Sequence, residues 1–177
     1  DHSKQVELLK KLRDIPGIEK VFVSSGIRFD MVIKDKKHGD EYLKEIAWHH
    51  TSGQLKIAPE HTAPNVLKLM GKPPKNHYLY KFKDKFNKYS KRAGKKQFLT
   101  YYFIAAHPGS TEENMQILKK IASQKLNINP RQVQIFTPTP STWSSVMYHT
   151  EENPFTGRKI FVEKNPHNKR QQKNILQ

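Results

Sequence analysis

Four short runs of β-branched, aromatic and other apolar residues recur along the chain, at residues 21–25, 54–58, 98–106 and 132–136. Each run is followed by turn-forming residues and has the composition of a buried strand. Segments with the apolar spacing of helices lie between the runs, beginning with one at Ser3, and a last polar helix is expected at residues 166–176. Strands that alternate with helices predict right-handed crossovers and a parallel sheet. The sequence therefore predicts an α/β fold with about four parallel strands.

The number of strands bears on the kind of sheet that we expect. A complete eightfold barrel needs roughly 250 residues and eight strands. The chain has 177 residues, and four strands make about half of such a barrel. We therefore expect a partial TIM-type barrel fragment, and because the first residue is Asp1 rather than Met, we also expect the chain to be a fragment.

Charge is unevenly distributed along the sequence. The chain carries 32 Lys and Arg against 16 Asp and Glu, a net charge of +16, and residues 68–97 hold a lysine-rich cluster in which Asp84 is the acid. The aromatic residues of this cluster fall on one face of a helix, at Tyr78, Phe82, Phe86 and Tyr89. Because this spacing is typical of a core-facing stripe, we favour a solvated basic helix over a nucleic-acid-binding one. The nucleic-acid module stays open as the alternative function.

Composition excludes several classes of protein. The chain has no cysteine, so disulfides and thiolate metal sites cannot form within it, and the absence of cysteine favours the cytoplasm. No apolar run approaches the length of a membrane span, and no metal-ligand spacing is found. We expect no membrane association and no metal site, and a surface of this charge would suit an anionic substrate.

Polar residues follow each predicted strand, where the active sites of α/β folds lie. The candidates at these strand exits are Ser25, Arg28, Glu60, His61, His107, Pro108, Gly109 and Thr137. Glu60 and His61 are suited to acid–base chemistry or to binding a ribose, and also to an Asx-like turn or a cap for the next helix. Arg28 is suited to clamping a phosphate or carboxylate, or to a surface ion pair. The His107–Gly109 turn is suited to binding an anion, or is a plain joint between strand and helix.

The same segments resemble the YgiQ family of radical SAM proteins. The resemblance lies in SSGIRFD (24–30), LKIAPEH (55–61), YFIAAHPG (102–109) and QVQIFTPTP (132–140), and also in VLKLMGKP (66–73) and MYHT (147–150). These segments are collinear with the family and span nearly the whole chain. The resemblance implies that residues 1–150 are the C-terminal part of a radical SAM core, and residues 151–177 an irregular segment with a basic tail or helix.

The resemblance also implies a fold, an iron–sulfur cluster and a bound cofactor. Radical SAM enzymes build a partial (β/α)6 barrel and hold a [4Fe-4S] cluster on a CxxxCxxC loop after the first strand. The cluster reduces S-adenosylmethionine (SAM) to a 5′-deoxyadenosyl radical. By position in the barrel, Glu60 would lie near the ribose, residues 107–109 near the methionine part and adenine, and Phe136 with Thr137 against adenine.

The departure from the family pattern concerns the cluster. Because the chain has no cysteine, it cannot hold an iron–sulfur cluster by itself. The resemblance then implies that the cysteines lie outside this chain, and that the chain alone is inactive and supplies one wall of the SAM and substrate site. The substrate of the family is not defined by these residues.

Overall fold

The computed structural model describes residues 1–130 and 132–177. It contains a three-stranded parallel sheet in the order β1-β2-β3, formed by β1 (Gln54–Glu60), β2 (Phe98–Ala105) and β3 (Val133–Ile135). β2 and β3 pair with Phe103 opposite Val133 and Ala105 opposite Ile135. The predicted α/β class with parallel strands is confirmed. The described residues form three of the four expected strands, and they do not close into a barrel.

The prediction of a strand at residues 21–25 is wrong. Val23 donates a backbone hydrogen bond to the His50 carbonyl, and Ile27 forms an isolated parallel bridge with Ile57, but residues 21–26 form no ladder. A strand needs repeated pairing along a neighbour. Phe22 is 48% exposed, so the apolar run is not buried as the prediction required.

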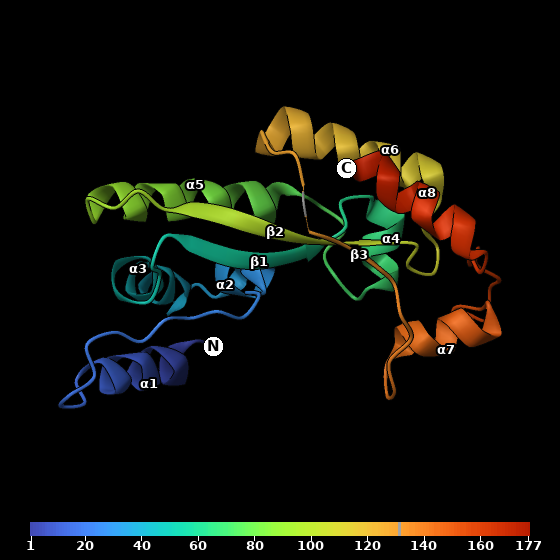
Figure 1. Ribbon diagram of the computed structural model, residues 1–177. Coiled ribbons are helices and arrows are strands. Elements are labelled where there is room, and N and C mark those ends of the chain that lie inside the picture. The colour runs from blue at the N-terminus through green and yellow to red at the C-terminus, as the bar shows by residue number, and fades with distance from the viewer. Residues whose placement is uncertain (131) are drawn as a thin grey trace. The chain divides into compact units, whose positions relative to one another are not determined.

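Two compact units make up the described chain. The first, residues 1–59 and 77–101, contains four helices: α1 (Ser3–Arg13), α2 (Phe29–Lys34), α3 (Gly39–His49) and α5 (His77–Arg92). α2, α3 and α5 contact one another, and α1 packs against α3. Figure 1 shows α5 running beside the first half of β2. The division of the chain at residue 150 that the sequence suggested stays a prediction.

The aromatic stripe of α5 is a core feature, as the sequence predicted. Phe82 and Phe86 are fully buried, and Tyr78 and Tyr89 are half-buried. Lys81 and the other lysines of the outer face are exposed or half-exposed. The helix is therefore stabilised by its apolar face, while the charges lie toward solvent.

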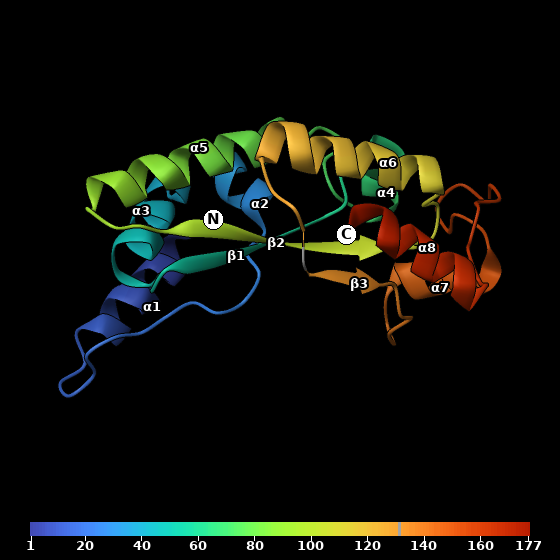
Figure 2. The same ribbon diagram turned by 45° about the horizontal axis from the view of Figure 1, so that its top comes forward.

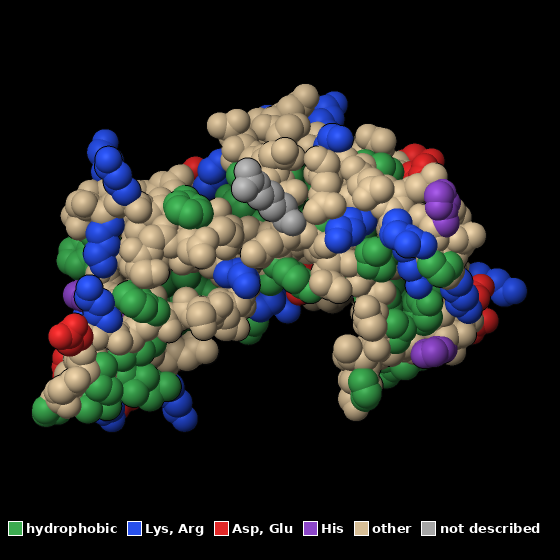
Figure 3. All heavy atoms as spheres, in the orientation of Figure 1, with side chains coloured by type: hydrophobic (Ala, Val, Ile, Leu, Met, Phe, Trp, Pro, Cys, Tyr) green, Lys and Arg blue, Asp and Glu red, His purple; other side chains and the backbone are tan. Residues whose placement is uncertain are grey.

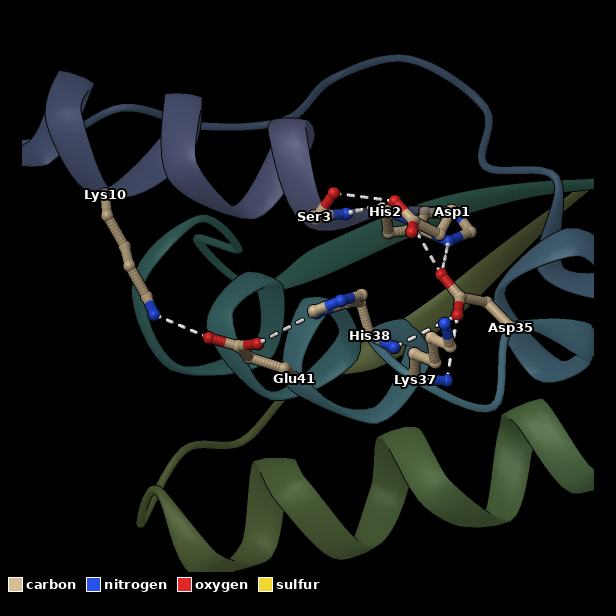
Figure 4. Close-up of polar contacts among 8 residues, drawn as sticks. All are labelled: Asp1, His2, Ser3, Lys10, Asp35, Lys37, His38 and Glu41. Carbon is tan, nitrogen blue, oxygen red and sulfur yellow. Dashed lines mark hydrogen bonds and ion pairs between the residues drawn. The ribbon is translucent and has the colours of Figure 1, made fainter.

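One carboxylate fixes the start of the chain in the first unit (Figure 4). Asp35 accepts hydrogen bonds from the backbone nitrogens of Lys37 and His38, and from both the backbone nitrogen and Nδ1 of His2, at 2.7–3.0 Å. The backbone donor of His38 and the side chain of His2 are the main causes that hold the pKa of Asp35 well below its usual range. Asp35 thereby joins the N-terminus of α1 to the turn between α2 and α3.

The second unit, residues 60–76 and 102–177, contains the remaining helices. These are α4 (Pro64–Leu69), α6 (Glu112–Ile121) with a π-helical turn at Ala122–Leu126, α7 (Trp143–Thr150) and α8 (Pro166–Leu176). The expected C-terminal helix is confirmed as α8, which packs against α6 and β3 (Figure 2). α7 was not predicted. In the described part of the chain, every helix is too short or too polar to cross a lipid bilayer.

Candidate functional site

Two strand exits in the second unit have an unusual backbone. Glu60, the last residue of β1, has φ +64°, and Ala106, directly after β2, has φ +57°. This left-handed conformation costs a residue with a Cβ on the order of 1–3 kcal/mol, and it persists only where surrounding contacts impose it. The contacts that impose it define the candidate site.

Glu60 is paired with a buried lysine. Its Oε2 lies 3.1 Å from Nζ of Lys72, whose side chain is 4% exposed, while the Glu60 side chain is 27% exposed. Gly71, with φ +65°, reverses the chain after α4 and so brings Lys72 back to the exit of β1. Sequence reasoning missed Lys72. Gly71 was the signal for it, because a glycine that ends a helix often reverses the chain and so could bring the next residue back to the exit of β1.

His61 serves the helix that follows it. Its Nδ1 accepts hydrogen bonds from the backbone nitrogens of Thr62 and Ala63, both at 3.0 Å, so the proton of the neutral ring is on Nε2. Nε2 lies 3.5 Å from the hydroxyl of Ser110. Burial, and to a smaller extent the neighbouring His107, lowers the pKa of His61 to about 3. His61 thus forms the Asx-like turn that leads into α4, and its predicted role in acid–base chemistry or ribose binding stays a prediction.

His107 has the opposite tautomer. Its Nδ1 donates to the carbonyl of Pro108 at 2.8 Å, which leaves Nε2 to accept from the Ser144 hydroxyl at 2.8 Å. The ring also meets Phe136 edge-on, with centroids 5.1 Å apart. Burial lowers the pKa of His107 to about 4. This neutral histidine therefore joins the exit of β2 to α7 and to the end of β3.

The turn after His107 is closely packed. Gly109 has φ +84°, and a Cβ at this position would lie 2.2 Å from a methyl carbon of Leu69 in α4. Its backbone nitrogen donates to the Phe161 carbonyl at 2.7 Å, and that of Ser110 donates to the His107 carbonyl at 2.8 Å. Protein carbonyls thus occupy the donors that were predicted to be suited to an anion. The turn joins β2 to α6, and a role for it in binding an anion stays a prediction.

The C-terminal helix reaches into the same turn. Gln172 of α8 accepts from the backbone nitrogen of Ala106 at 3.0 Å and donates to the Ser110 carbonyl at 3.1 Å. Sequence reasoning missed Gln172 and Ser144, because neither lies near a strand exit along the chain. A buried polar residue on a polar helix leaves no signal in apolar periodicity.

A pocket of about 700 Å³ lies after β3. The backbone nitrogen of Phe136 donates to the Ala105 carbonyl at 2.8 Å and extends the pairing of β3 by one residue, while Thr137 is exposed. Residues 138–142 and α7 then line the pocket. Its residues are Pro138, Thr139, Pro140, Ser141, Thr142, Trp143, Ser145, Val146, His149 and Thr150.

Residues of α7 both line the pocket and contact the exits of β2 and β3. Trp143, Val146 and Thr150 line the pocket. Ser144 contacts His107, and Tyr148, one turn further on, lies 5.8 Å from Phe136 between ring centroids. His107 therefore fixes the helix that forms one wall of the pocket.

The two remaining candidates, Ser25 and Arg28, belong to the first unit. Ser25 is exposed. The guanidinium of Arg28 pairs with both carboxylate oxygens of Asp30, at 2.9 Å each. For Arg28 the structure shows the ion pair that was the alternative to a ligand clamp. Over the described residues, no three His, Asp or Glu side chains are grouped so that they could hold a metal ion.

The fold and site define an α/β protein whose polar residues gather at the carboxyl ends of parallel strands. The chain is similar over its length to UPF0313 proteins. It is 58% identical over 176 residues to a UPF0313 protein from Fusobacterium nucleatum subsp. nucleatum. The aligned region makes up 99% of this chain and 31% of that protein. It is 44% identical to a UPF0313 protein from Clostridium perfringens, and the alignment covers 100% of this chain and 26% of that protein. It is 46% identical to one from Clostridium botulinum, where the alignment covers 100% of this chain and 27% of that protein.

The chain therefore spans between about a quarter and a third of the length of these relatives. UPF0313 is the family of the YgiQ proteins, so the matches agree with the resemblance found in the sequence. A model described as a domain of unknown function, DUF3362, matches residues 131–177. This segment contains β3, α7 and α8, which supply the pocket, Ser144 and Gln172.

Proposed function

We propose that the chain is part of a UPF0313 protein that is a radical SAM enzyme, and that its second unit supplies one wall of the SAM site. The observation that carries this proposal is the pocket after β3, at the strand exit where the resemblance implies adenine. The barrel relationship, with β1, β2 and β3 as strands of a partial (β/α)6 barrel, is part of the same proposal.

The chemistry of the pocket fits an adenine ring. Its ten lining residues include no Lys, Arg, Asp or Glu, although 27% of the chain is charged. Trp143 is 59% exposed and offers an aromatic face, and the hydroxyl groups around it can accept or donate single hydrogen bonds. A volume of about 700 Å³ lies within the range of small-molecule sites, about 300–1,000 Å³. An uncharged, planar group matches these walls better than a phosphate does.

The exit of β1 fits the sugar. The Glu60 carboxylate is partly exposed and is held by buried Lys72, so it can accept hydrogen bonds from ribose hydroxyls without losing its ion pair. The hydroxyl of Thr62, two residues further on, is buried with no hydrogen-bond partner among the described residues. Such a group costs about 1–3 kcal/mol unless it finds a partner. The partly exposed Glu60 carboxylate supports a polar ligand at this exit.

The iron–sulfur cluster does not fit this chain, because no cysteine is present and cluster ligation requires thiolates. In the proposed full-length protein those thiolates come from another part of the polypeptide. SAM and the cluster would together supply the chemistry of hydrogen-atom abstraction in the full-length protein. The residues of this chain bind and orient: Glu60 at the sugar, and the walls around Trp143 at the base.

Binding of SAM to the full-length protein tests this assignment. Glu60→Ala should weaken SAM binding by about tenfold to a hundredfold, because hydrogen bonds to a charged group contribute about 1.5–3 kcal/mol. Glu113→Ala, at an exposed position of α6, is the control and should bind as the wild type does. Equal affinity of both variants in equilibrium dialysis would remove Glu60 from the site.

The alternative, a nucleic-acid-binding module, depends on the exposed lysines of α5. Phe82 and Phe86 are fully buried, so they cannot stack on bases. On the face drawn in Figure 3, Lys and Arg side chains are scattered among hydrophobic and neutral ones rather than gathered in one stripe. Nucleic-acid contact by α5 would be electrostatic and steeply dependent on salt.

A further inference from the structure

Gln172 is an exception on its helix. α8 is polar, with four basic residues between Pro166 and Leu176 counting His167, and most of its polar side chains are exposed or half-exposed. Gln172 is 1% exposed, whereas the adjacent Gln171 is exposed. A buried amide is stable only when its hydrogen bonds are made. Its position therefore depends on the partners that it finds in the exit turn of β2.

Those partners lie at both ends of the turn. The Gln172 side-chain oxygen accepts from the backbone nitrogen of Ala106, and its side-chain nitrogen donates to the Ser110 carbonyl. The Ser110 hydroxyl also lies 3.4 Å from the same side-chain oxygen. One orientation of the amide satisfies all of these contacts, because Ala106 offers a donor and the Ser110 carbonyl an acceptor.

These contacts continue into the exit of β1. His61 has its proton on Nε2, which faces the Ser110 hydroxyl at 3.5 Å, and Ser110 in turn faces Gln172. Each group in this series donates to the next one: the backbone before α4 donates to His61, His61 to Ser110, and Ser110 to Gln172. Gln172 is the acceptor at the end of this series.

The turn itself needs such a support. Ala106 is fully buried and has φ +57°, a conformation that costs on the order of 1–3 kcal/mol for a residue with a Cβ. Its backbone nitrogen lies beyond the last residue of β2. The Gln172 side chain supplies the acceptor for this nitrogen, which would otherwise be buried without one.

The rest of the C-terminal segment acts on the same turn. The Phe161 carbonyl accepts from the backbone nitrogen of Gly109 at 2.7 Å. Lys169 donates to the Tyr148 hydroxyl at 2.8 Å and so joins α8 to α7. Contacts from residues 161, 169 and 172 thus reach both the exit turn of β2 and the helix that lines the pocket.

We infer that the C-terminal segment, residues 151–177, supports the strand-exit site, and that Gln172 is the positioning residue that holds the turn at residues 106–110, in which Ala106 and Gly109 have positive φ. The segment is thereby assigned a role in forming the site rather than a separate activity. The effect on SAM binding rests on the proposed function, whereas the effect on the turn does not.

Hydrogen exchange in the full-length protein tests the inference. Gln172→Met keeps the size of the side chain and removes its three hydrogen bonds, and Gln171→Met makes the same substitution at the exposed neighbour. The backbone amides of Ala106, His107, Gly109 and Ser110 should exchange roughly tenfold to a hundredfold faster in the first variant than in the second, because the buried donor of Ala106 loses its partner. Equal exchange in the two variants would overturn the inference.

Two readouts separate this inference from the proposed function. If the wild type fails to bind SAM but Gln172→Met still accelerates exchange at residues 106–110, the proposed function is lost and the positioning role stands. If the wild type binds SAM, the same variant should weaken binding by about tenfold or more, as expected for loss of buried hydrogen bonds. Unchanged SAM binding together with unchanged exchange would reject the role.

Gln172→Glu provides a second variant should Gln172→Met unfold the protein. A protonated carboxyl group at this position can donate to the Ser110 carbonyl, whereas a carboxylate cannot, and burial favours the protonated form. Exchange at residues 106–110 should therefore be close to wild type at pH 5.5 and at least about tenfold faster at pH 8, beyond the ordinary pH dependence seen in the wild type and in Gln171→Glu. A ratio to the wild type that does not change with pH would contradict the positioning role.

Discussion

The ammonium group of Lys72 lies 3.1 Å from the carboxylate of Glu60, and the lysine is almost completely buried while the glutamate is partly open to solvent. Glu60 also ends β1 in the left-handed conformation. The pair therefore holds a strained strand exit together, and the exposed part of the carboxylate lies where a ligand can reach it.

Replacing the buried partner tests this relationship. Lys72→Met should lower the free energy of unfolding by about 1–3 kcal/mol, less than the 3–5 kcal/mol of a fully buried pair, because water can solvate the remaining carboxylate. Lys75→Met changes an exposed lysine of the same loop and should change stability by less than about 0.5 kcal/mol. Urea denaturation measures both. Equal stabilities of the two variants would show that the ion pair does not support the exit.

The two buried histidines predict acid sensitivity. His61 and His107 are neutral in the folded protein, with pKa values lowered to about 3 and about 4, while the unfolded chain titrates near 6.5. Each histidine has a lower pKa in the folded protein than in the unfolded chain. The contribution of the neutral rings to the free energy of unfolding is therefore complete above about pH 6.5 and is lost as the pH falls. Each histidine should add about 1.4 kcal/mol per pH unit to the slope of unfolding free energy against pH, between about pH 6 and pH 4.

A variant that cannot titrate isolates this effect. His61→Asn keeps an oxygen that can accept from the backbone nitrogens of Thr62 and Ala63 but has no ionisable group. The slope of unfolding free energy against pH should fall by about 1.4 kcal/mol per unit. His77→Asn, at an exposed position, serves as the matched control. A slope that stays the same in His61→Asn would show that His61 is not buried as a neutral ring.

Gly109 is predicted to be the least replaceable glycine of the second unit. A Cβ there would meet Leu69 at 2.2 Å in addition to the strain of φ +84°. Gly157 has φ +66° but nothing within 4 Å of the added Cβ. Gly157→Ala should therefore cost about 1–2 kcal/mol from the backbone alone, and Gly109→Ala clearly more, as thermal or urea unfolding would measure. Equal losses would mean that the contact between Gly109 and α4 is not tight.

Charge reversal on α5 distinguishes the proposed function from its alternative. Lys81→Glu, Lys88→Glu and Lys91→Glu change exposed positions outside the second unit and should leave SAM binding within about twofold of wild type, because Glu60 and the pocket belong to the second unit and exposed charges are screened by salt. If the chain instead binds RNA or DNA with a steep salt dependence that these changes reduce, the nucleic-acid module gains support. Filter binding at several salt concentrations makes the comparison.

Much of the fold could be predicted because its elements carry local signals. The alternation of buried and half-buried residues in β2 and the aromatic stripe of α5 follow from apolar periodicity. Residues 21–25 had the composition of a strand, but pairing depends on a neighbour that composition does not reveal. α7 begins at the Thr142 side chain, which accepts from the backbone of Ser145, and its short length weakened its pattern.

Only the candidate residues that directly follow a strand in the sequence could be predicted. The strand-exit rule found Glu60, His61 and His107, whose neighbours in sequence are strands. It did not find Lys72, which reaches Glu60 through a turn, or Gln172, which lies 66 residues beyond Ala106. Such partners are brought together by tertiary packing, and a single sequence carries no record of those distances.

We propose above that this strand-exit wall belongs to a SAM-cleaving enzyme. The most direct measurement is the formation of 5′-deoxyadenosine by the full-length protein, reconstituted without oxygen with iron, sulfide and a reductant. We predict that the wild type forms 5′-deoxyadenosine from SAM and that Glu60→Ala forms it at least about tenfold more slowly at limiting SAM. A wild type with a fully assembled, reducible cluster that forms none would contradict the claim.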